Sequence, residues 1–341
     1  MKYDVTIGIP VYKSELYIRQ TLESALAQKY PSIEFLLIDD AGGDGSLAII
    51  QEIQQTHQRG GAMRVITHDR NMGVSASRNQ IIEEAKGDYL YFMDSDDIIA
   101  ENTISIMMEN VRRYGAEIVF GSYEKIEISG IRHVYQYPAL LLFEKDSLAS
   151  FAYRKYAGIQ ASACNYLVKI SILRENQLCF INTNFWEDMV FTYELVTYVS
   201  RAVMLPNITY YYCCRENSLS NYQCRTQIDK EEIMQNVKTI EYLKQRTSLL
   251  TNKVYYPHRC YVLALTDFYI VCNILKKRRL IVPYVSNSEI KNILAFPASL
   301  KQIIHFRKCL FPNIALYVLS KQPSCLCVCA VWLIGKMRRL L

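Results

Sequence analysis

The N-terminal third of the chain alternates short apolar runs with stretches in which apolar residues recur at helical spacing. Short apolar runs bounded by turn residues are typical of buried strands, whereas apolar residues three and four apart form one face of a helix. The expected strands are 5–9, 33–38, 63–67, 89–93 and 117–122, and the expected helices are 17–28, 46–55, 75–85 and 101–114. This rhythm predicts an α/β fold with a mainly parallel central sheet flanked by helices on both faces.

Beyond the fifth expected strand the pattern becomes mixed and then mostly helical. The elements expected there are a helix near 146–156, strands near 161–168 and 203–212, and helices over 229–250 and 255–276. A chain of 341 residues is long enough for two medium domains. We therefore expect one domain over 1–220, with halves at about 1–123 and 124–220, and a helical C-terminal region over 221–341, with the boundary near Asn221.

The composition narrows the class of protein. Hydrophobic residues make up 50% and charged residues 21% of the chain, which is typical of a folded globular protein rather than a disordered one. A net charge of +6 with 33 acidic residues is too weakly basic for generic nucleic-acid binding, so no nucleic-acid partner is expected.

Cysteine usage indicates a reducing compartment. The 11 cysteines are odd in number and irregularly spaced, and Met1 leads straight into a strand-like segment without a cleavable apolar region. We therefore expect a cytoplasmic protein. Cys325, Cys327 and Cys329 form a C-x-C-x-C cluster inside an apolar run, and no His or second Cys pair lies near it to complete a metal site.

Acidic residues stand directly after two of the expected strands. Asp94 and Asp96 follow the fourth strand along the chain, and Asp39 and Asp40 end the second. Ligands of such sheets bind beyond the carboxyl ends of the strands. Alternate carboxylates can bind one hard cation that bridges a diphosphate. The alternative is a turn and helix cap, but two buried strands that bring acids to one edge favour a bound cation or hydrogen-bond donors there.

Five segments carry recognisable motifs in a fixed order. They are I-G-I-P-V-Y (7–12), L-L-I-D-D (36–40), N-M-G-V-S-A-S-R-N (71–79), F-M-D-S-D-D (92–97) and W-E-D-M-V-F (186–191). Together, over residues 2–220, they resemble glycosyltransferase family 2. The resemblance implies a GT-A nucleotide-diphospho-sugar transferase fold, with 1–123 as the nucleotide-binding half and 124–220 as the acceptor half. It also implies an activated nucleotide sugar, a divalent cation (Mn²⁺ or Mg²⁺) and inversion at the anomeric carbon.

The same resemblance assigns residues to the nucleotide base. Pro10 and Tyr12 are expected in the loop that frames the base, and Asp40 is expected to accept a hydrogen bond from a uracil ring. The alternative for Asp40 is a cap on the helix that starts near Ser46, and Asp39 is expected to be structural. The chain reads D-D-A-G-G-D where the family usually reads D-D-G-S-x-D, so the hydroxyl after the acids is missing.

Further residues are expected to contact the diphosphate and the cation. Arg78 is expected to face the nucleotide, where its guanidinium can fork to phosphate or base oxygens; the alternative is a solvated helix-surface Arg. Asp94 is expected to contact the ribose or the metal, and Asp96 is the expected main metal ligand. Asp97 is expected to cap the next helix. Arg215 is expected to fold over the diphosphate, with a plain surface charge as the alternative.

Asp188 is the candidate general base. In an inverting transfer the acceptor hydroxyl attacks opposite the leaving diphosphate, and a carboxylate takes its proton. A metal offsets the charge that grows on the leaving group. Glu187 and Asp188 open a helical segment after Phe185 and Trp186. The alternative is a charge pair that interacts with the helix dipole.

Residues 310–341 are unusually apolar. The run 324–335 is nearly uninterrupted and is followed by Lys336, Arg338 and Arg339. It is too short to span a bilayer, which needs about 20 apolar residues. One interpretation is an interfacial helix on an anionic leaflet, which would place the protein peripherally on the cytoplasmic face of the inner membrane. The other is a C-terminal helix packed on the domain core or on a dimer partner.

These patterns predict an inverting glycosyltransferase that moves a sugar from a nucleotide-diphosphate donor, with uridine as the expected base. The expected acceptor is a hydroxyl of a glycan or polyprenyl-linked glycan in surface polysaccharide synthesis. A sugar-nucleotide pyrophosphorylase would need a Gly-rich, Arg-containing loop after the first strand, but the chain has P-V-Y-K-S (10–14). A non-catalytic nucleotide-sugar-binding protein would lack the metal or base carboxylates, which are present. The sequence does not set an oligomeric state.

Overall fold

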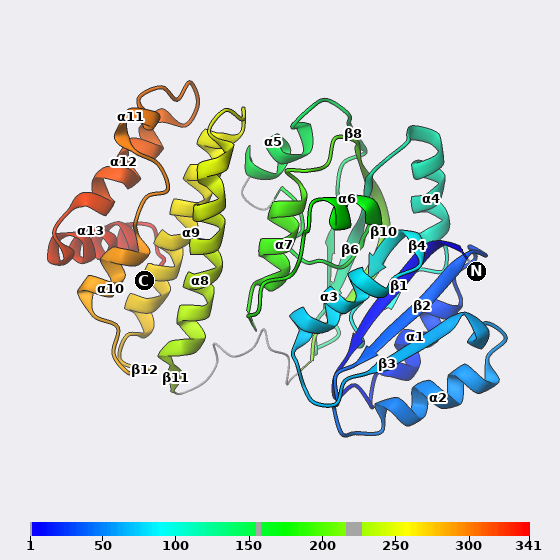
Figure 1. The fold of residues 1–341 in the computed structure, drawn as a ribbon. Helices are drawn as coiled ribbons and strands as arrows, with labels where there is room; N and C mark the ends of the chain where they lie inside the picture. The colour runs from blue at the N-terminus through cyan, green and yellow to red at the C-terminus, as the bar shows by residue number, and fades with distance from the viewer. Residues whose placement is uncertain (1, 155–157, 184, 216–226) are drawn as a thin grey trace. The chain divides into compact units, whose positions relative to one another are not determined.

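The computed structural model describes residues 2–154, 158–183, 185–215 and 227–341 (Figure 1). The chain divides into two compact units. The first is Met1–Leu148 with Ala161–Ser218, and the second is Ala149–Gln160 with Leu219–Leu341. The boundary expected near Asn221 lies outside the described residues.

The first unit is built on one mixed sheet. Within the described residues the strand order is β3-β2-β1-β4-β9-β6-β10-β5, with β7 paired to β6 and β8 to β10. The strands are β1 (Tyr3–Val11), β2 (Ile33–Asp39), β3 (Met63–Thr67), β4 (Gly87–Phe92), β5 (Ile98–Ile99), β6 (Ile118–Ile126), β7 (Arg132–Tyr135), β8 (Leu140–Leu142), β9 (Tyr166–Lys169) and β10 (Ala202–Cys213). The four strands β3-β2-β1-β4 are parallel, and β9 runs antiparallel to both β4 and β6.

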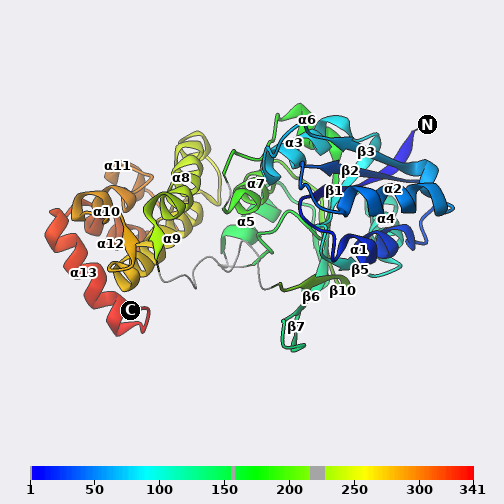
Figure 2. The same ribbon diagram turned by 90° about the horizontal axis from the view of Figure 1, so that it is seen from below.

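Helices cover both faces of this sheet. They are α1 (Ile18–Leu26), α2 (Ser46–Thr56), α3 (Val74–Glu84), α4 (Thr103–Tyr114), α6 (Ile170–Glu175) and α7 (Glu187–Leu195). Figure 2 shows α3 and α6 on one side of the parallel strands and α1 and α2 on the other. All seven residues of β2 are buried, as expected for a strand between two helical layers. The strand and helix rhythm predicted for the N-terminal third is confirmed.

Gly8 brings α3 close to the sheet. A Cβ at this position of β1 would lie 2.4 Å from Cγ2 of Ile81 on α3, which is shorter than any stable contact. The absence of a side chain therefore allows the helix to pack directly on the backbone of the strand. Because α3 also carries Arg78, this close packing fixes where that side chain lies.

A buried polar cluster joins β6, β9 and β10. Asn165 donates through Nδ2 to the carbonyls of Gly121 (2.7 Å) and Ser122 (3.2 Å), and its Oδ1 accepts from Thr209 Oγ1 (2.6 Å). Its φ of 67° lies in the left-handed region, which Asn tolerates better than most residues. The cluster lies where the β10–β6 register shifts, and so it holds the irregular part of β10 in place.

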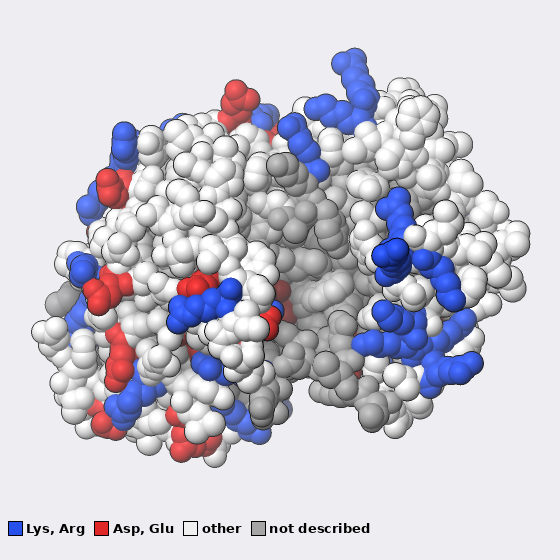
Figure 3. Space-filling view, turned by 180° about the vertical axis from the view of Figure 1, so that it is seen from behind, with Lys and Arg blue, Asp and Glu red and all other residues white. Residues whose placement is uncertain are grey.

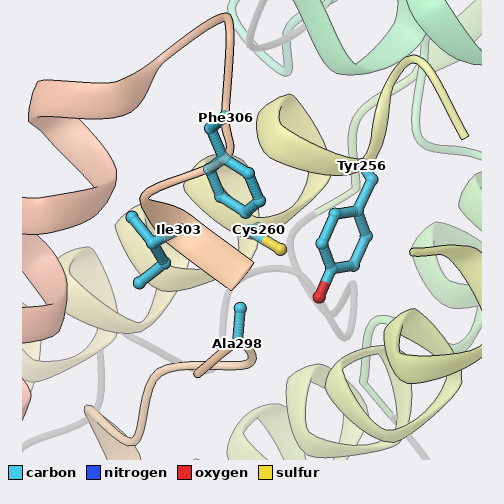
Figure 4. Close-up of a cluster of buried hydrophobic side chains, with 5 residues drawn as sticks. All are labelled: Tyr256, Cys260, Ala298, Ile303 and Phe306. Atoms are coloured by element: carbon cyan, nitrogen blue, oxygen red, sulfur yellow. The ribbon is translucent and has the colours of Figure 1, made fainter. Parts of the chain in front are cut away.

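The second unit is mostly helical. Its helices are α8 (Lys230–Thr247), α9 (Tyr256–Lys277), α10 (Asn287–Ile293), α11 (Leu300–Ile303), α12 (Leu310–Lys321) and α13 (Ser324–Met337), with a parallel pair of short strands, β11 (Ile228–Asp229) and β12 (Ile281–Val282). Part of its core lies between α9 and α11, where Tyr256 and Cys260 pack with Ala298, Ile303 and Phe306 (Figure 4). No helix in the described part of the chain combines the length and hydropathy needed to cross a bilayer.

Most of α5 (Ser147–Arg154) belongs to the second unit. The buried guanidinium of Arg259 on α9 donates to Tyr153 Oη on α5, to Thr247 Oγ1 (2.8 Å) and to the carbonyl of Leu243 (3.2 Å). The rings of Tyr153 and Tyr255 stack with centroids 5.7 Å apart. These contacts hold α5 on α8 and α9, although Ala161–Ser218, which come later in the chain than α5, belong to the first unit.

The Asn165 cluster gives a stability prediction. Asn165→Ala removes the side-chain bond to the buried carbonyl of Gly121, whereas Ser122 O and Thr209 Oγ1 keep the bond that they make to each other (3.2 Å). Leaving a buried polar group unpaired costs about 1–3 kcal/mol. We expect the free energy of unfolding, measured by urea denaturation, to fall by about 2–3 kcal/mol.

The matched control is Asn176→Ala, since Asn176 is exposed at the end of α6 and makes a single side-chain bond to Ile172 O. We expect that change to cost less than about 1 kcal/mol. Equal effects of the two substitutions would contradict the role assigned to the cluster.

Candidate active site

Arg78 joins three segments that are far apart in the sequence. From α3 it donates through Nη2 to Asp94 Oδ1 (2.9 Å), after β4, and through Nη1 to Glu187 Oε1 (2.8 Å), in the first turn of α7. The Arg78 side chain is buried, and its guanidinium lies over the Phe180 ring at 5.4 Å. The alternative of a solvated helix-surface Arg is therefore wrong. The expected direct contact with a nucleotide stays a prediction.

Asp188 lies beside this cluster at the N-terminus of α7. Its Oδ1 accepts from the backbone N–H of Met189 (2.7 Å), and Trp186 before the helix has a φ of 62°. Burial, and after it the negative charge of Glu187, raise the pKa of Asp188 to about 7, although Arg78 opposes this shift. A carboxyl group that titrates near neutral pH can accept a proton under physiological conditions.

Asp96 is the second carboxyl group with a raised pKa. Burial and the negative charge of Asp94 raise its pKa to about 6, whereas Arg215 opposes the shift. Two carboxylates that repel each other in a partly buried place are stabilised by a cation, so this pair fits a divalent ion. Within the described residues no three His, Cys, Asp or Glu side chains are grouped as metal ligands. Mg²⁺ is commonly bound by one or two carboxylates with substrate phosphates completing the shell.

Asp97 has a structural role that differs from the predicted one. Its buried carboxylate accepts from Tyr210 Oη (2.6 Å) and from the backbone N–H of Cys213 (2.8 Å), both on β10. The next helix, α4, has Asn102 at its N-cap, so the predicted cap by Asp97 is wrong. Tyr210 Oη also accepts from Asp94 N (3.2 Å). The end of β10 therefore holds the loop of residues 94–97, the acidic loop, in place.

Arg215, two residues after the end of β10, also holds this loop. Its Nη2 donates to the carbonyl of Asp96 (2.7 Å), and its guanidinium lies over the Tyr17 ring at 4.1 Å. These two contacts exclude the alternative of a plain surface charge. The predicted contact with a diphosphate stays a prediction.

Asp40 fastens the loop that precedes α3. Its Oδ1 lies 2.6 Å from Nδ1 of His68 and accepts from Met72 N (2.7 Å), and its Oδ2 accepts from Gly73 N (2.8 Å). The alternative role as a cap of α2 is wrong, because the N-cap there is Gly45. Oδ2 has one hydrogen bond among the described residues, which leaves an acceptor position for the predicted uracil contact.

Pro10 and Tyr12 differ in their surroundings. Pro10 is buried inside β1 opposite Ile38, whereas Tyr12 lies just after the strand and is 45% exposed. The expectation that Pro10 lies in the loop is wrong. Proline fits in the strand because the β1–β4 pairing ends at Gly8, so no partner on that side needs its missing N–H.

Sequence reasoning missed several residues that build this site. Glu187 was considered only as part of a helix charge pair, and neither His68 nor Tyr210 was assigned a role. Their partners lie far along the chain, so no local spacing reveals them. The one available signal was the acidic pair at 187 and 188 next to a motif that already contained a candidate base.

Residues 6–166 match the family described as Glycosyl transferase family 2. The chain is 34% identical over 126 residues to an uncharacterized glycosyltransferase of Haemophilus influenzae, an overlap of 37% of this chain and 49% of that protein. It is 24% identical over 230 residues to glycosyltransferase GlyG of Streptococcus pneumoniae (66% and 74%). It is 26% identical over 215 residues to a teichoic acid poly(glycerol phosphate) polymerase of Staphylococcus epidermidis (61% and 28%). The match thus spans about half of the Haemophilus protein.

Two solved structures share the fold. TarS of S. aureus (1–349, in complex with UDP-GlcNAc) aligns with a TM-score of 0.66 at 16% identity, over 94% of this chain and 90% of that chain. Mannosyltransferase PcManGT of Pyrobaculum calidifontis, in complex with GDP-Man and Mn²⁺, aligns with a TM-score of 0.52 at 13% identity, over 94% and 87%. The expected GT-A α/β fold with a helical C-terminal region is confirmed. Because residues 6–166 match the family model and include the Arg78–Asp94 link, this segment of the chain is a glycosyltransferase family 2 domain.

Proposed function

We propose that this chain is an inverting glycosyltransferase that moves a sugar from a UDP-sugar to a hydroxyl of a glycan or polyprenyl-linked glycan. The observation that carries the proposal is the buried Arg78 bridge, which holds the loop of Asp94 and Asp96 next to the helix of Asp188. A site for a diphosphate and a site for a base are thereby brought together. The UDP-GlcNAc bound by TarS supports a uridine donor, and the teichoic acid polymerase supports a role in surface polysaccharide synthesis.

Asp94 and Asp96 are the residues that would hold a divalent cation, Mn²⁺ or Mg²⁺. When bound, such a cation offsets the negative charge that grows on the leaving diphosphate. The raised pKa of Asp96 supports this assignment. It indicates that the positive charge of Arg215 does not offset the effects of burial and of Asp94 on this carboxylate. The Mn²⁺ in the PcManGT complex supports a metal in this fold.

Asp188 would take the proton of the acceptor hydroxyl as the new glycosidic bond forms at the anomeric carbon. A base must be ionised to act, so the pKa of about 7 allows a large fraction of Asp188 to work near neutral pH. Arg78 keeps Glu187 paired and limits the rise of the Asp188 pKa. Arg215, which already bonds the acidic loop, would add positive charge beside the leaving group.

We also propose that residues 310–341 bring the enzyme to the cytoplasmic face of a membrane, where a polyprenyl-linked acceptor would lie. Apolar residues of α12 and α13 are exposed, among them Phe311 (81%) and Met337 (84%). Exposed apolar side chains beside Lys and Arg support peripheral attachment.

Asp96→Asn tests the cation site. We expect wild-type protein to bind UDP at least about tenfold more tightly with Mn²⁺ than without it, and the variant to lose this gain, because its side chain no longer offers a charged ligand. Calorimetric titration of UDP in the presence and absence of Mn²⁺ measures the two affinities for the wild type and for the variant. The melting temperature of the variant should equal or exceed that of the wild type, because the substitution removes a buried negative charge.

Asp88→Asn is the matched control, since Asp88 lies on the surface in an ion pair with Lys2. It should keep the gain from Mn²⁺. If Asp96→Asn binds UDP with the same dependence on Mn²⁺ as the control, Asp96 is not a metal ligand. A screen of nucleotide sugars for slow hydrolysis then identifies the donor.

Asp188→Asn tests the base. We expect kcat to fall by about 10²–10⁴ while the affinity for UDP stays the same, because the substitution removes proton transfer and leaves the nucleotide contacts. In wild-type protein kcat/KM should rise with pH through about 7 as Asp188 ionises. Glu187→Gln should move this rise to lower pH, since the negative charge of Glu187 raises the Asp188 pKa.

The measurement is the initial rate of transfer between pH 5.5 and 9 for the three proteins. A kcat/KM that does not change over this range, or transfer by Asp188→Asn at the wild-type rate, would remove Asp188 from the mechanism.

A further inference from the structure

The last helix of the second unit exposes most of its apolar surface. In α13 the buried residues are Cys327, Val331 and Gly335, which are four residues apart and form one narrow stripe. The large apolar residues Leu326, Trp332, Leu333, Ile334 and Met337 are between 39% and 84% exposed. A helix that is apolar on all sides is normally buried on all sides. Its outer face therefore needs a partner.

A hollow of about 790 Å³ lies along this helix. One wall is apolar and comes from α13, with Val328, Trp332 and Leu333. The facing wall is the cationic run 276–279 at the end of α9, together with Tyr284. The hollow thus offers an apolar surface and positive charge side by side, both within the second unit.

The cations of this hollow differ in their availability. Arg278 is held by the carbonyl of Val285 (2.8 Å) and Asn287 Oδ1 (2.7 Å), and its guanidinium lies over the Tyr284 ring. In contrast, Lys276 and Arg279 are exposed. Lys276 and Arg279 can therefore contact a ligand while Arg278 keeps its contacts with Val285, Asn287 and Tyr284.

The charge around α13 has one sign. Residues 290–341 contain eight Lys or Arg and no Asp or Glu. The last two acids of the chain are already paired, Asp267 with Lys244 in the interior and Glu289 with Lys230. Figure 3 shows Lys and Arg gathered over the C-terminal unit on the face drawn, with few acidic groups among them.

Exposed apolar residues beside an excess of positive charge favour one kind of binding partner over others. A second copy of the chain that packed against the exposed apolar face of α13 would bring the positive charges of the two copies together, which is unfavourable. A nucleic acid would satisfy the cations but leave the apolar side chains uncovered. An anionic lipid surface covers the apolar residues with acyl chains and pairs the cations with headgroup phosphates. Tryptophan is favoured at that interface, and Trp332 lines the hollow with Lys336 Nζ 4.6 Å from the centre of its ring.

We propose that the hollow between α13 and residues 276–284 is a binding site for the headgroup of an anionic phospholipid, with α13 lying in the plane of the membrane surface. A helix of 14 residues is about 21 Å long, which suits a segment that lies along the interface rather than across it. Lys276 and Arg279 bind the headgroup phosphate, and Trp332 and Leu333 enter the acyl boundary. The inference rests on the membrane attachment proposed above for residues 310–341, but it does not depend on the transfer reaction proposed for the first unit.

The test measures binding of the full chain to sedimented vesicles of phosphatidylcholine with and without about 30% phosphatidylglycerol, which carries a negative charge. We expect at least about tenfold tighter binding to the anionic vesicles and a loss of that preference at high salt. Lys276→Glu/Arg279→Glu should remove the preference. Lys86→Glu/Lys145→Glu, which reverses two exposed charges of the first unit, should keep it.

The depth of Trp332 is read separately. The chain has two tryptophans, so in a Trp186→Phe background the fluorescence reports Trp332 alone. Lipids brominated on the acyl chain should quench it, and Trp332→Ala/Leu333→Ala should weaken binding to the anionic vesicles by at least about tenfold.

The proposal is overturned if binding does not depend on phosphatidylglycerol, if the two charge-reversal variants bind equally, or if brominated lipid does not quench Trp332. Self-association that Trp332→Ala/Leu333→Ala abolishes, without any vesicle binding, would assign the face to a second copy instead. None of these measurements uses a sugar nucleotide, so their outcome is independent of the transfer reaction.

Discussion

The site depends on one buried guanidinium. Arg78 makes ion pairs with Asp94 and Glu187, and without it the nearly buried Glu187 carboxylate would lose its compensating charge, whereas Asp94, with 33% of its side chain exposed, would lose less. The loss of one partner of a buried pair is costly, of the order of 3–5 kcal/mol, because the remaining charge is left unpaired. The bridge therefore forces the loop after β4 and the first turn of α7 to lie together. Gly8 and Asp40 support it indirectly, since one allows α3 to pack closely and the other anchors the loop before α3.

The same bridge separates the carboxyl groups by function. Asp94 and Glu187 are paired with Arg78, and Asp97 is bonded to β10, so these three groups already have partners. Burial and the charges of Asp94 and Asp96 raise the pKa of Asp97 as well, so it is the hydrogen bonds to Tyr210 and Cys213 that set this group apart. Asp96 and Asp188, with pKa values of about 6 and about 7, are the two carboxyl groups that we propose for cation binding and proton transfer.

How far the sequence alone predicts this structure depends on the range of the interactions. Local periodicity was sufficient for β1, β2, α3 and the other early elements, because their apolar pattern reports burial directly. It did not reveal β5 or β7, which are short or exposed. It predicted a strand near 161–168, where β9 lies, but not the antiparallel position of that strand between β4 and β6. At the site, the motif residues were identified from their residue types and from the order of the motifs along the chain. The roles of Asp97 and Pro10 were predicted wrongly, because they depend on β10 and on where the β1–β4 pairing stops.

The path of the chain argues that the helical unit is more than an appendage. Ala149–Gln160 belong with the C-terminal helices, and within this unit Arg259 on α9 holds Tyr153 of α5 in the interior. A protein without α8 and α9 would leave Tyr153 without the buried partners that Arg259 and Tyr255 supply. Exposing such a surface is unfavourable. Because each unit is built from two stretches of the chain that alternate in sequence, no single cut of the chain separates the two units.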